Sequence, residues 1–362
     1  MKIGILTHHY VDNYGAFLQV YALQQAIHKT FPDAKVEVIN YINIRHMIIN
    51  RIGWWRFYRD KETLPLWKKK TQIHRIFQCA KRRYLHESKI CFTSNGINRM
   101  HYDVIVVGSD EVWNFTDNKA NAKVKFGAGL TCPNIISYAA SVGKSTYTEE
   151  LPSYVVEGIR SFSAVSARDD ATAELAQNLG VSVTRVLDPT FLINFPRRNV
   201  ESTKRQIEEP YILFYYCDDM PYKVKSQLIR QAKKAGYQVY GAGEVDHRYS
   251  KPTINITPFE WVELFRHASY VFTGTFHGAV FSILHEKQFS LYIGSNVSRV
   301  RKIQSLLTEL GIEDRNMNAN TEFDFQTLSC GMESIDYEKV NISIQEKRKH
   351  SIDYIRRAVC II

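Results

Sequence analysis

The stretch FTGTFHGAVFSIL, residues 272–284, runs from a β-rich segment through a glycine-containing turn into an apolar segment. A strand followed by a helix is the repeating unit of α/β proteins, in which helices cover parallel strands. Strand-like and helix-like segments alternate in this way along most of the 362 residues. The sequence therefore predicts an α/β fold with parallel sheets flanked by helices.

The predicted strands form two series. The first covers residues 3–7, 36–40, 104–107, 135–138, 164–166 and 183–186, and the second covers residues 211–216, 238–241, 270–273 and 288–292. Residues 194–209 are polar and contain or border prolines, which is typical of an interdomain linker. We predict two Rossmann-like domains, residues 1–193 and 210–334, that face each other across a cleft, and a helix over 335–362 that packs back.

Cysteine usage and hydropathy bear on the compartment. The six cysteines are scattered, without a CxxC pair or zinc-ligand spacing, which fits free thiols in a reducing compartment. No run of about 18 apolar residues occurs, so we expect no membrane-spanning helix. The prediction is a cytoplasmic protein.

The positive charge is concentrated in one segment. Residues 45–83 contain twelve Lys and Arg but only Asp60 and Glu62 as acidic residues, and so carry the whole net charge of +10. Aromatic residues interleave with these cations, which suits an anionic membrane surface or a lipid-phosphate-linked substrate. Single-stranded nucleic acid and a solvated helical pair are the alternatives. We expect peripheral contact with the inner face of the cell membrane and no nucleic-acid partner.

Polar residues follow the first predicted strand and lead into a helix. Asp12, Asn13 and Tyr14 precede helical residues that include Gln19. A helix amino terminus favours an anion or sugar oxygens, so this loop and the start of its helix are a candidate ligand site. The alternative is that Asp12 or Asn13 is only the helix cap.

The predicted strand at residues 104–107 ends in Gly108, Ser109 and Asp110. Asp110 is a candidate to accept a proton from a sugar hydroxyl, and Trp113 is a candidate to stack on a sugar ring. The alternatives are an aspartate that caps the next helix and a tryptophan in the core.

Motifs for several other chemistries are absent. The sequence has no phosphate loop with its lysine and no GxGxxG, which argues against mononucleotide and dinucleotide cradles. His8 and His9 point in opposite directions in an extended chain, so they are a poor pair for a metal ion. We expect no metal and no tightly bound cofactor.

An arginine and a histidine stand at two other predicted turns from strand to helix. Arg168 can bind a phosphate or carboxylate through two hydrogen bonds, and a structural ion pair with Asp169 or a neighbouring loop is the alternative. In the opening stretch, Thr275 can cap a helix whose first amides, at residues 276–278, can hold an anion beside His277.

Seven short motifs occur in order along the chain. They are IGILT (3–7), NYGAFLQVYAL (13–23), VGSDEVWN (107–114), SYAASVG (137–143), SARD (166–169), LDPT (187–190) and TFHGAVFS (275–282). Together they resemble the polysaccharide pyruvyl transferase family, over roughly residues 1–312. The resemblance implies a fold similar to the GT-B glycosyltransferases. It also implies phosphoenolpyruvate as donor and, as acceptor, a sugar in an exopolysaccharide or capsule precursor. A lipid-linked acceptor rests on the basic segment, residues 45–83, and not on the resemblance.

The resemblance also assigns residues. Arg168 and His277 would engage the donor, and the regions of Asn13, Gln19 and Asp110 would bind the acceptor. On the donor side, the start of the second-domain helix supplies Thr275, Phe276 and Gly278. This sequence has Lys302 where an arginine is commoner in the family, so the remaining donor-binding candidates are Arg299, Arg301 and Lys302.

Ketal formation explains these residue types. The donor's methylene carbon must gain a proton, two hydroxyls must add, and phosphate must leave. The predicted catalytic residues are His277 for proton transfer, Arg168 for the anionic donor and Asp110, or else Asp12, as the acceptor base. Phosphate binding alone by His277 is an open alternative.

Two other functions fit parts of the sequence. A GT-B-type glycosyltransferase that uses a nucleotide sugar would need a similar cation and helix start. A non-enzymatic adaptor would rest on residues 45–83 alone.

Overall fold

The computed structural model describes residues 1–55, 64–148, 150–196, 210–217, 219–251, 253–294, 297–317 and 334–361. The chain divides into two compact units. The first unit comprises Met1–Gly53, Gln78–Asn194 and Ile342–Ile362, and the second comprises Trp54–Phe77 and Phe195–Asn341. Most of the predicted linker, residues 194–209, lies outside the described residues.

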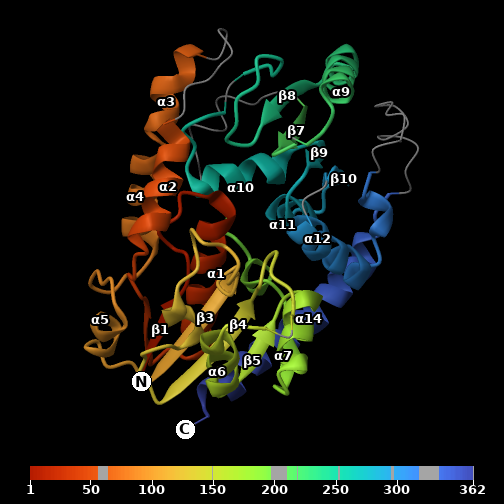
Figure 1. The fold of residues 1–362 in the computed structure, drawn as a ribbon. Coiled ribbons are helices and arrows are strands. Elements are labelled where there is room, and N and C mark those ends of the chain that lie inside the picture. Colours follow the sequence, from red (N-terminus) through yellow and green to blue (C-terminus); the bar gives the residue numbers. More distant parts are fainter. Residues whose placement is uncertain are drawn as a thin grey trace. The chain divides into compact units, whose positions relative to one another are not determined.

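Six parallel strands form the sheet of the first unit, in the order β2-β1-β3-β4-β5-β6 (Figure 1). They are β1 Lys2–Leu6, β2 Lys35–Val38, β3 Val104–Asp110, β4 Asn134–Ala140, β5 Val165–Ala167 and β6 Val183–Arg185. Alternate residues of β3 enter two different cores because successive side chains of a strand point to opposite faces. Helices cover both faces, which explains why β3 and β4 are hydrophobic without alternation.

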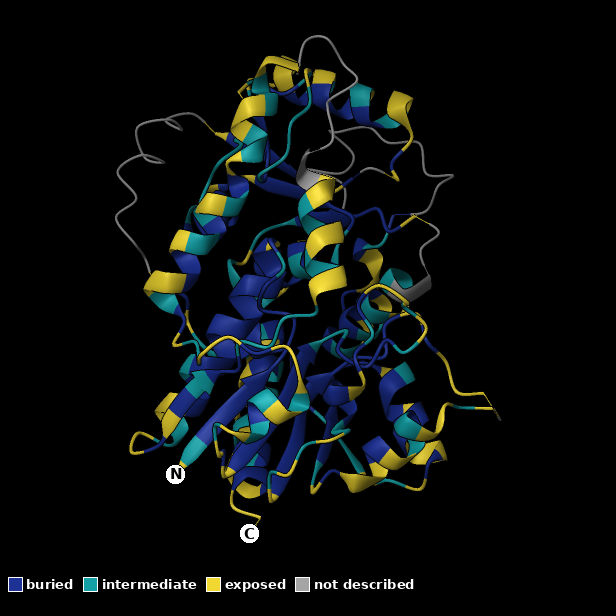
Figure 2. Cartoon of the chain, turned by 60° about the vertical axis from the view of Figure 1, so that its left-hand side comes forward, coloured by how far each residue is buried: buried dark blue, intermediate teal, exposed yellow. Residues whose placement is uncertain are grey.

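Several helices of the first unit contribute side chains to these two cores. Side chains of α1 and α14 contribute to one core, and side chains of α6 and α7 contribute to the other. The helices that lie wholly or mainly in this unit are α1 Tyr14–Thr30, α2 Ile44–Trp55, α4 Ile73–Tyr84, α5 Ser94–Asn98, α6 Ser153–Ser161, α7 Asp170–Asn178 and α14 Tyr337–Val359. Figure 2 shows the strands buried and the helices exposed along their outer sides.

The carboxy-terminal helix α14 packs on the first sheet. Tyr354 Oη donates a hydrogen bond to the Ser137 carbonyl (2.8 Å), and Asn134 Nδ2 donates to the Ala358 carbonyl (3.0 Å). These contacts explain why residues 342–362 belong to the first unit although they follow the second unit in sequence.

Four parallel strands form the second sheet, in the order β10-β9-β7-β8. They are β7 Tyr211–Tyr215, β8 Gln238–Gly241, β9 Tyr270–Thr273 and β10 Phe289–Leu291. The described helices of this unit are α3 Trp67–Thr71, α9 Tyr222–Lys234, α10 Pro258–His267, α11 Phe276–Leu284 and α12 Val297–Leu310. Residues 54–77 cluster with this unit, whereas the sequence placed all of residues 45–83 in the first domain. One contact that joins them is the hydrogen bond from Asn255 Nδ2 to Gln72 Oε1 (3.1 Å).

Side-chain caps fix where several helices begin. Asn13 Oδ1 accepts a hydrogen bond from the Ala16 amide (3.0 Å) and starts α1. Before α10, the Thr257 hydroxyl accepts from the Glu260 amide, and the Glu260 carboxylate accepts from the Thr257 amide. This reciprocal capping satisfies amides that have no partner within the helix.

The predicted fold class is confirmed. Each of the ten predicted strands is present, as is a helix over residues 337–359. Among the described helices, none has the length and apolar character needed to cross a bilayer.

Candidate functional site

The first sheet reverses its winding direction between β1 and β3. β1 has β2 on one side and β3 on the other. Ligands of open parallel sheets bind beyond the carboxyl ends of the strands at such a reversal. The loop after β1, residues 7–13, and the residues that end and follow β3 lie at this position.

The end of β3 has an unusual backbone. Gly108 has a φ of 129°, and a Cβ there would lie 2.1 Å from the Tyr138 carbonyl oxygen, so no side chain fits. Asp110 has a φ of 77°, in the left-handed region that non-glycine residues rarely occupy. Residues held in such conformations are concentrated at functional sites. This backbone is a second reason to place a site here.

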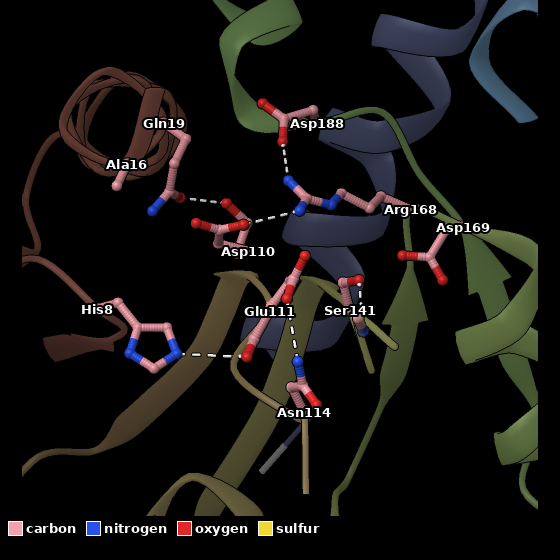
Figure 3. A network of polar contacts seen from close by, with 12 residues as sticks. His8, Ala16, Gln19, Asp110, Glu111, Asn114, Ser141, Arg168, Asp169 and Asp188 are labelled. Carbon is pink, nitrogen blue, oxygen red and sulfur yellow. Dashed lines mark hydrogen bonds and ion pairs between the residues drawn. The ribbon is translucent and has the colours of Figure 1, made fainter. Parts of the chain in front are cut away.

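Arg168 lies between two carboxylates (Figure 3). Its Nη2 is 2.8 Å from Asp110 Oδ1, and its Nη1 is 2.6 Å from Asp188 Oδ2. Burial works against the charged guanidinium, but the carboxylates of Asp110 and Asp188 outweigh it and raise the pKa of Arg168. The guanidinium is therefore engaged in a buried ion-pair cluster with one more negative than positive charge.

The structural ion pair expected as an alternative for Arg168 exists, and its partners are Asp110 and Asp188 from neighbouring segments, not Asp169. Asp169 instead caps α7, where its Oδ1 accepts from the Thr172 amide (3.0 Å). Asp188 accepts from the Thr190 amide (3.1 Å) and so shapes the LDPT turn that presents it to Arg168. Asp110 is the one carboxylate of the cluster with an appreciable exposed fraction, 23% of its side chain.

Gln19 is enclosed in the structure. Its side chain is fully buried, it accepts a hydrogen bond from Ser109 Oγ, and its Nε2 donates to Thr7 Oγ1 (3.4 Å). The Thr7 hydroxyl in turn donates to the Ser109 carbonyl (2.9 Å). Gln19 thus ties α1 to the ends of β1 and β3, and the prediction that it contacts the acceptor has no support from its position.

The prediction that Trp113 stacks on a sugar is wrong. The side chain is fully buried, its ring stacks on Phe126, and its Nε1 donates to the Lys125 carbonyl (2.9 Å). Since packing fills the surroundings of the ring, no face is open to a ligand. The alternative, a tryptophan in the core, is what the structure shows.

Of the predicted residues in the loop after β1, Asn13 caps α1 and Tyr14 is buried as the first residue of that helix. Asp12 is buried and pairs with Lys81 (3.5 Å). Burial lowers the pKa of Lys81, and the Asp12 carboxylate opposes that change. Asp12 is therefore enclosed and less available to a substrate than Asp110.

His8 and His9 point to different partners, as the extended chain predicts. His9 Nε2 lies 3.2 Å from Asn40 Oδ1. Burial first, and then the charge of Lys81, lowers the pKa of His9 to about 4. Across the described part of the chain, no group of three or more His, Cys, Asp or Glu side chains is arranged to hold a metal ion.

His8 contacts a residue that the sequence reading missed. The Nζ of Lys125 lies 2.7 Å from His8 Nδ1, and Lys125 is fully buried. His8 Nε2 also lies 3.3 Å from the Glu111 carbonyl oxygen, next to Asp110 in the chain. In the sequence Lys125 stands in a polar stretch without a motif, so no local signal marks it.

The second sheet also reverses its winding, between β7 and β9. The turn after β9 carries the predicted donor residues. Gly274 lies where a Cβ would meet the carbonyl oxygens of Tyr216 (2.5 Å) and Tyr292 (2.7 Å), so the turn needs a glycine. The start of α11 thus lies at the carboxyl ends of the strands, at the position where such sheets bind ligands.

The amino terminus of α11 has the predicted cap. Thr275 Oγ1 accepts from the Gly278 amide (3.1 Å), so that amide is already occupied. Gly278 itself packs against β9, because a Cβ there would lie 2.0 Å from Thr273 Oγ1. His277 is half-buried and lies edge-on to the buried ring of Phe276. Arg168 and His277 belong to different units.

The basic residues of α12 differ in their surroundings. Arg299 pairs with Asp219 (3.0 Å) and lies 5.5 Å from the ring centre of Tyr216, which follows β7. Arg301 is exposed and Lys302 is half-buried. Of these three basic residues, Arg299 is therefore the one with described contacts to residues that follow β7, the strand at which the second sheet reverses its winding.

The comparisons with known proteins agree with this architecture. A solved structure described as a putative UDP-N-acetylglucosamine 2-epimerase from Listeria monocytogenes is similar at a TM-score of 0.55 and 10% identity, covering 99% of this chain and 95% of the other. A UDP-GlcNAc 2-epimerase from Methanocaldococcus jannaschii is similar at a TM-score of 0.51 and 12% identity, covering 95% and 92%. At these identities the likeness is one of fold alone, and it supports the predicted GT-B-like class.

Sequence comparison identifies the family. No curated protein matches the chain. The model of the family described as polysaccharide pyruvyl transferase matches residues 13–294, a span that contains Asp110, Arg168 and the start of α11. This chain belongs to the polysaccharide pyruvyl transferase family.

Proposed function

We propose that the protein transfers a pyruvyl group from phosphoenolpyruvate to two hydroxyls of one sugar in a surface-polysaccharide precursor. The family match over residues 13–294 carries the proposal. In the reaction, carbon 2 of the donor bonds to both sugar oxygens. One hydroxyl proton ends on the methylene carbon, which becomes a methyl group, and the other leaves with phosphate. The site must therefore hold an anionic donor, supply a proton and accept one.

The start of α11 is the proposed donor site. A helix amino terminus carries partial positive charge and suits the phosphate and carboxylate of the donor. Thr275, Phe276 and Gly278 shape this terminus, and Arg299, with Arg301 and Lys302 on α12, adds positive charge in the same unit. His277 is the proposed proton donor to the methylene carbon, since its ring is half-buried at the first turn of the helix.

Asp110 is the proposed acceptor base. It lies at the reversal of the first sheet and has a partly exposed carboxylate, whereas the side chain of Asp12 is 1% exposed and paired with Lys81. Arg168 holds Asp110 in place through the 2.8 Å ion pair. The donor contact that the family resemblance implies for Arg168 would require the donor to displace Asp110 from the guanidinium.

The acceptor is proposed to be linked to a lipid, so that the enzyme works at the inner face of the cell membrane. Helix α2 supports this proposal, because Ile44, Ile48 and Ile52, which follow one another at intervals of four, are 50%, 47% and 60% exposed. Residues at this spacing share one side of a helix. Most of this helix lies within residues 45–83, which contain twelve Lys and Arg against Asp60 and Glu62. Exposed apolar side chains in a segment of net positive charge suit an anionic lipid surface.

Ligand-dependent stabilisation tests the donor. A ligand that binds only the folded state raises the midpoint of thermal unfolding. We expect phosphoenolpyruvate to raise that midpoint, and UDP- and GDP-sugars to leave it unchanged. The opposite pattern would favour the alternative function, a glycosyltransferase that uses a nucleotide sugar.

A further inference from the structure

The first unit contains a buried lysine, Lys125, that makes no ion pair with any carboxylate among the described residues. Lys125 lies in the 3₁₀ turn Lys123–Phe126 and is fully buried. Its amide donates to the Ala122 carbonyl (2.9 Å), and its own carbonyl accepts from Trp113 Nε1 (2.9 Å). Both backbone polar groups of Lys125 are thus hydrogen-bonded. Lysines are almost never fully buried without an ionic partner, so this placement calls for a functional explanation.

Among the described residues, the hydrogen-bond partner of the Lys125 amine is His8. Nζ lies 2.7 Å from Nδ1 and 3.2 Å from Nε2 of the ring. No described carboxylate lies within ion-pair distance of Nζ. An amine and an imidazole in contact cannot both be charged without strong repulsion, so the pair holds at most one extra proton near neutral pH.

The charged and titratable groups around the pair come from four elements. His8 itself, His9 and Tyr10 follow β1, His46 is on α2, Asp110 ends β3, and Asp117 lies in the loop after β3. The ring of Tyr10 is 6.3 Å from that of His8, and the charge of Lys125 also acts on His9. The rings of His8 and His46 are 5.3 Å apart. Asp110 and Asp117 act on Lys125 electrostatically and favour its ammonium form. The exchangeable charge therefore lies within electrostatic reach of the proposed acceptor base.

Burial determines which member of the pair carries the proton. Burial lowers the pKa of Lys125 to about 7, even though the charges of Asp110 and Asp117 oppose this shift. Burial first, and then the positive charges of Lys125 and His46, lowers the pKa of His8 well below its usual value. Burial likewise lowers the pKa of His46 to about 4. The pair therefore loses its extra proton near neutral pH.

We propose that the Lys125–His8 pair is a switchable charge that acts electrostatically on Asp110, and that loss of its proton makes Asp110 a stronger base toward the acceptor hydroxyl. The proposal rests on the proposed function, in which Asp110 takes that proton. A nearby positive charge favours the ionised carboxylate and so weakens it as a base. When Lys125 is neutral, no ammonium at this position offsets the excess negative charge of the cluster of Asp110, Arg168 and Asp188. Lys125 is then a positioning residue that acts through Asp110.

The first test does not depend on enzymatic activity. Between pH 7 and the much higher pKa of an unfolded lysine, the unfolded chain binds one proton more at this residue than the folded chain, so stability rises with pH. Lys125→Met removes that contribution. We expect the unfolding midpoint of the variant, relative to wild type, to be highest at pH 6 and to fall steadily toward pH 9. Lys123→Met, a neighbouring exposed lysine, should show a constant difference.

The second test uses pyruvyl transfer measured from pH 5.5 to 9. We expect wild-type kcat to rise through about pH 7. Lys125→Met should lose this inflection, and Lys125→Arg, which stays charged, should have a kcat at pH 8 about tenfold below wild type, equivalent to about 1.4 kcal/mol. A wild-type inflection that persists in Lys125→Met would overturn the proposal while leaving the proposed function intact. If wild type transfers no pyruvyl group, the proposed function fails, and the stability test still decides whether Lys125 titrates.

Discussion

Arg168 donates a 2.8 Å hydrogen bond to Asp110, although the two residues lie 58 positions apart in the chain and belong to different strand ends. The same guanidinium holds Asp188 at 2.6 Å. Parallel strands bring their carboxyl ends to one edge, which explains how three distant motifs form one cluster. This cluster fixes the position of the carboxylate that we propose as the acceptor base.

Removal of the guanidinium should be strongly destabilising. Arg168→Met leaves two carboxylates without their cation, one of them fully buried, and should lower the free energy of unfolding by about 3–5 kcal/mol. Arg185→Met is the matched control, because Arg185 pairs at 3.2 Å with an aspartate that is 80% exposed and should cost less than about 1 kcal/mol. Urea denaturation of both variants is the measurement. Equal losses of unfolding free energy in the two variants would show that the buried ion pairs of Arg168 stabilise the protein no more than the exposed pair of Arg185.

Replacement of His277 should abolish transfer without unfolding the protein. We expect His277→Ala to lower kcat by at least about 100-fold, the usual contribution of a general acid, with an unchanged unfolding midpoint. His267→Ala, an exposed histidine of α10, should keep wild-type turnover. Near wild-type kcat in His277→Ala would remove this ring from the mechanism.

Gly278 should resist even the smallest substitution. Gly278→Ala would place a Cβ 2.0 Å from Thr273 Oγ1, so we expect a loss of about 1–3 kcal/mol from overpacking. Gly53→Ala is the control, since a Cβ there meets no atom within 4 Å and alanine favours a helix by up to about 1 kcal/mol. We expect the midpoint of thermal unfolding to fall below that of wild type in Gly278→Ala and to rise above it in Gly53→Ala. A neutral Gly278→Ala would contradict the close packing of α11 on β9.

Acid should destabilise the first unit through His9. Because its folded pKa, about 4, is below that of an unfolded histidine, the unfolded chain binds one proton more between about pH 4 and 6.5. Stability therefore falls as the pH drops through this window. His9→Gln should make the fall shallower by up to about 3 kcal/mol, and exposed His28→Gln should not change it. Urea midpoints at pH 4.5, 5.5 and 7 provide the comparison.

Helix α2 should bind anionic membranes. We expect wild-type protein to sediment with phosphatidylglycerol vesicles and not with phosphatidylcholine vesicles. The double variant Ile48→Asp, Ile52→Asp should lose this binding, and Ile342→Asp, an equally exposed isoleucine on α14, should keep it. Equal sedimentation with both kinds of vesicle, or none with either, would refute charge-dependent binding to anionic membranes. A change from dimer to monomer in the double variant would identify a second copy of the chain as the occupant.

The strands were predictable because each is a short hydrophobic run bounded by polar or glycine-containing turns, and burial on both faces removes the need for alternation. Asn13 and Thr275 were predictable as caps, since capping depends on local sequence. The Lys125–His8 contact joins residues 117 apart, and no local pattern encodes such a pairing. Trp113 shows the same limit. The local motif is the same for a tryptophan in the core and for one that stacks on a sugar, and only its contacts with the Lys125 carbonyl and Phe126 show that it lies in the core.

The central claim is that phosphoenolpyruvate is the donor and a sugar diol is the acceptor. The most direct measurement incubates the protein with phosphoenolpyruvate and a panel of free and lipid-linked glycosides, and follows the products by mass spectrometry and the released phosphate by a colorimetric assay. We predict that one glycoside gains the mass of a pyruvate ketal, with one phosphate released for each ketal formed. Glycosyl transfer from a UDP- or GDP-sugar to the same panel, with no pyruvylated product, would contradict the claim.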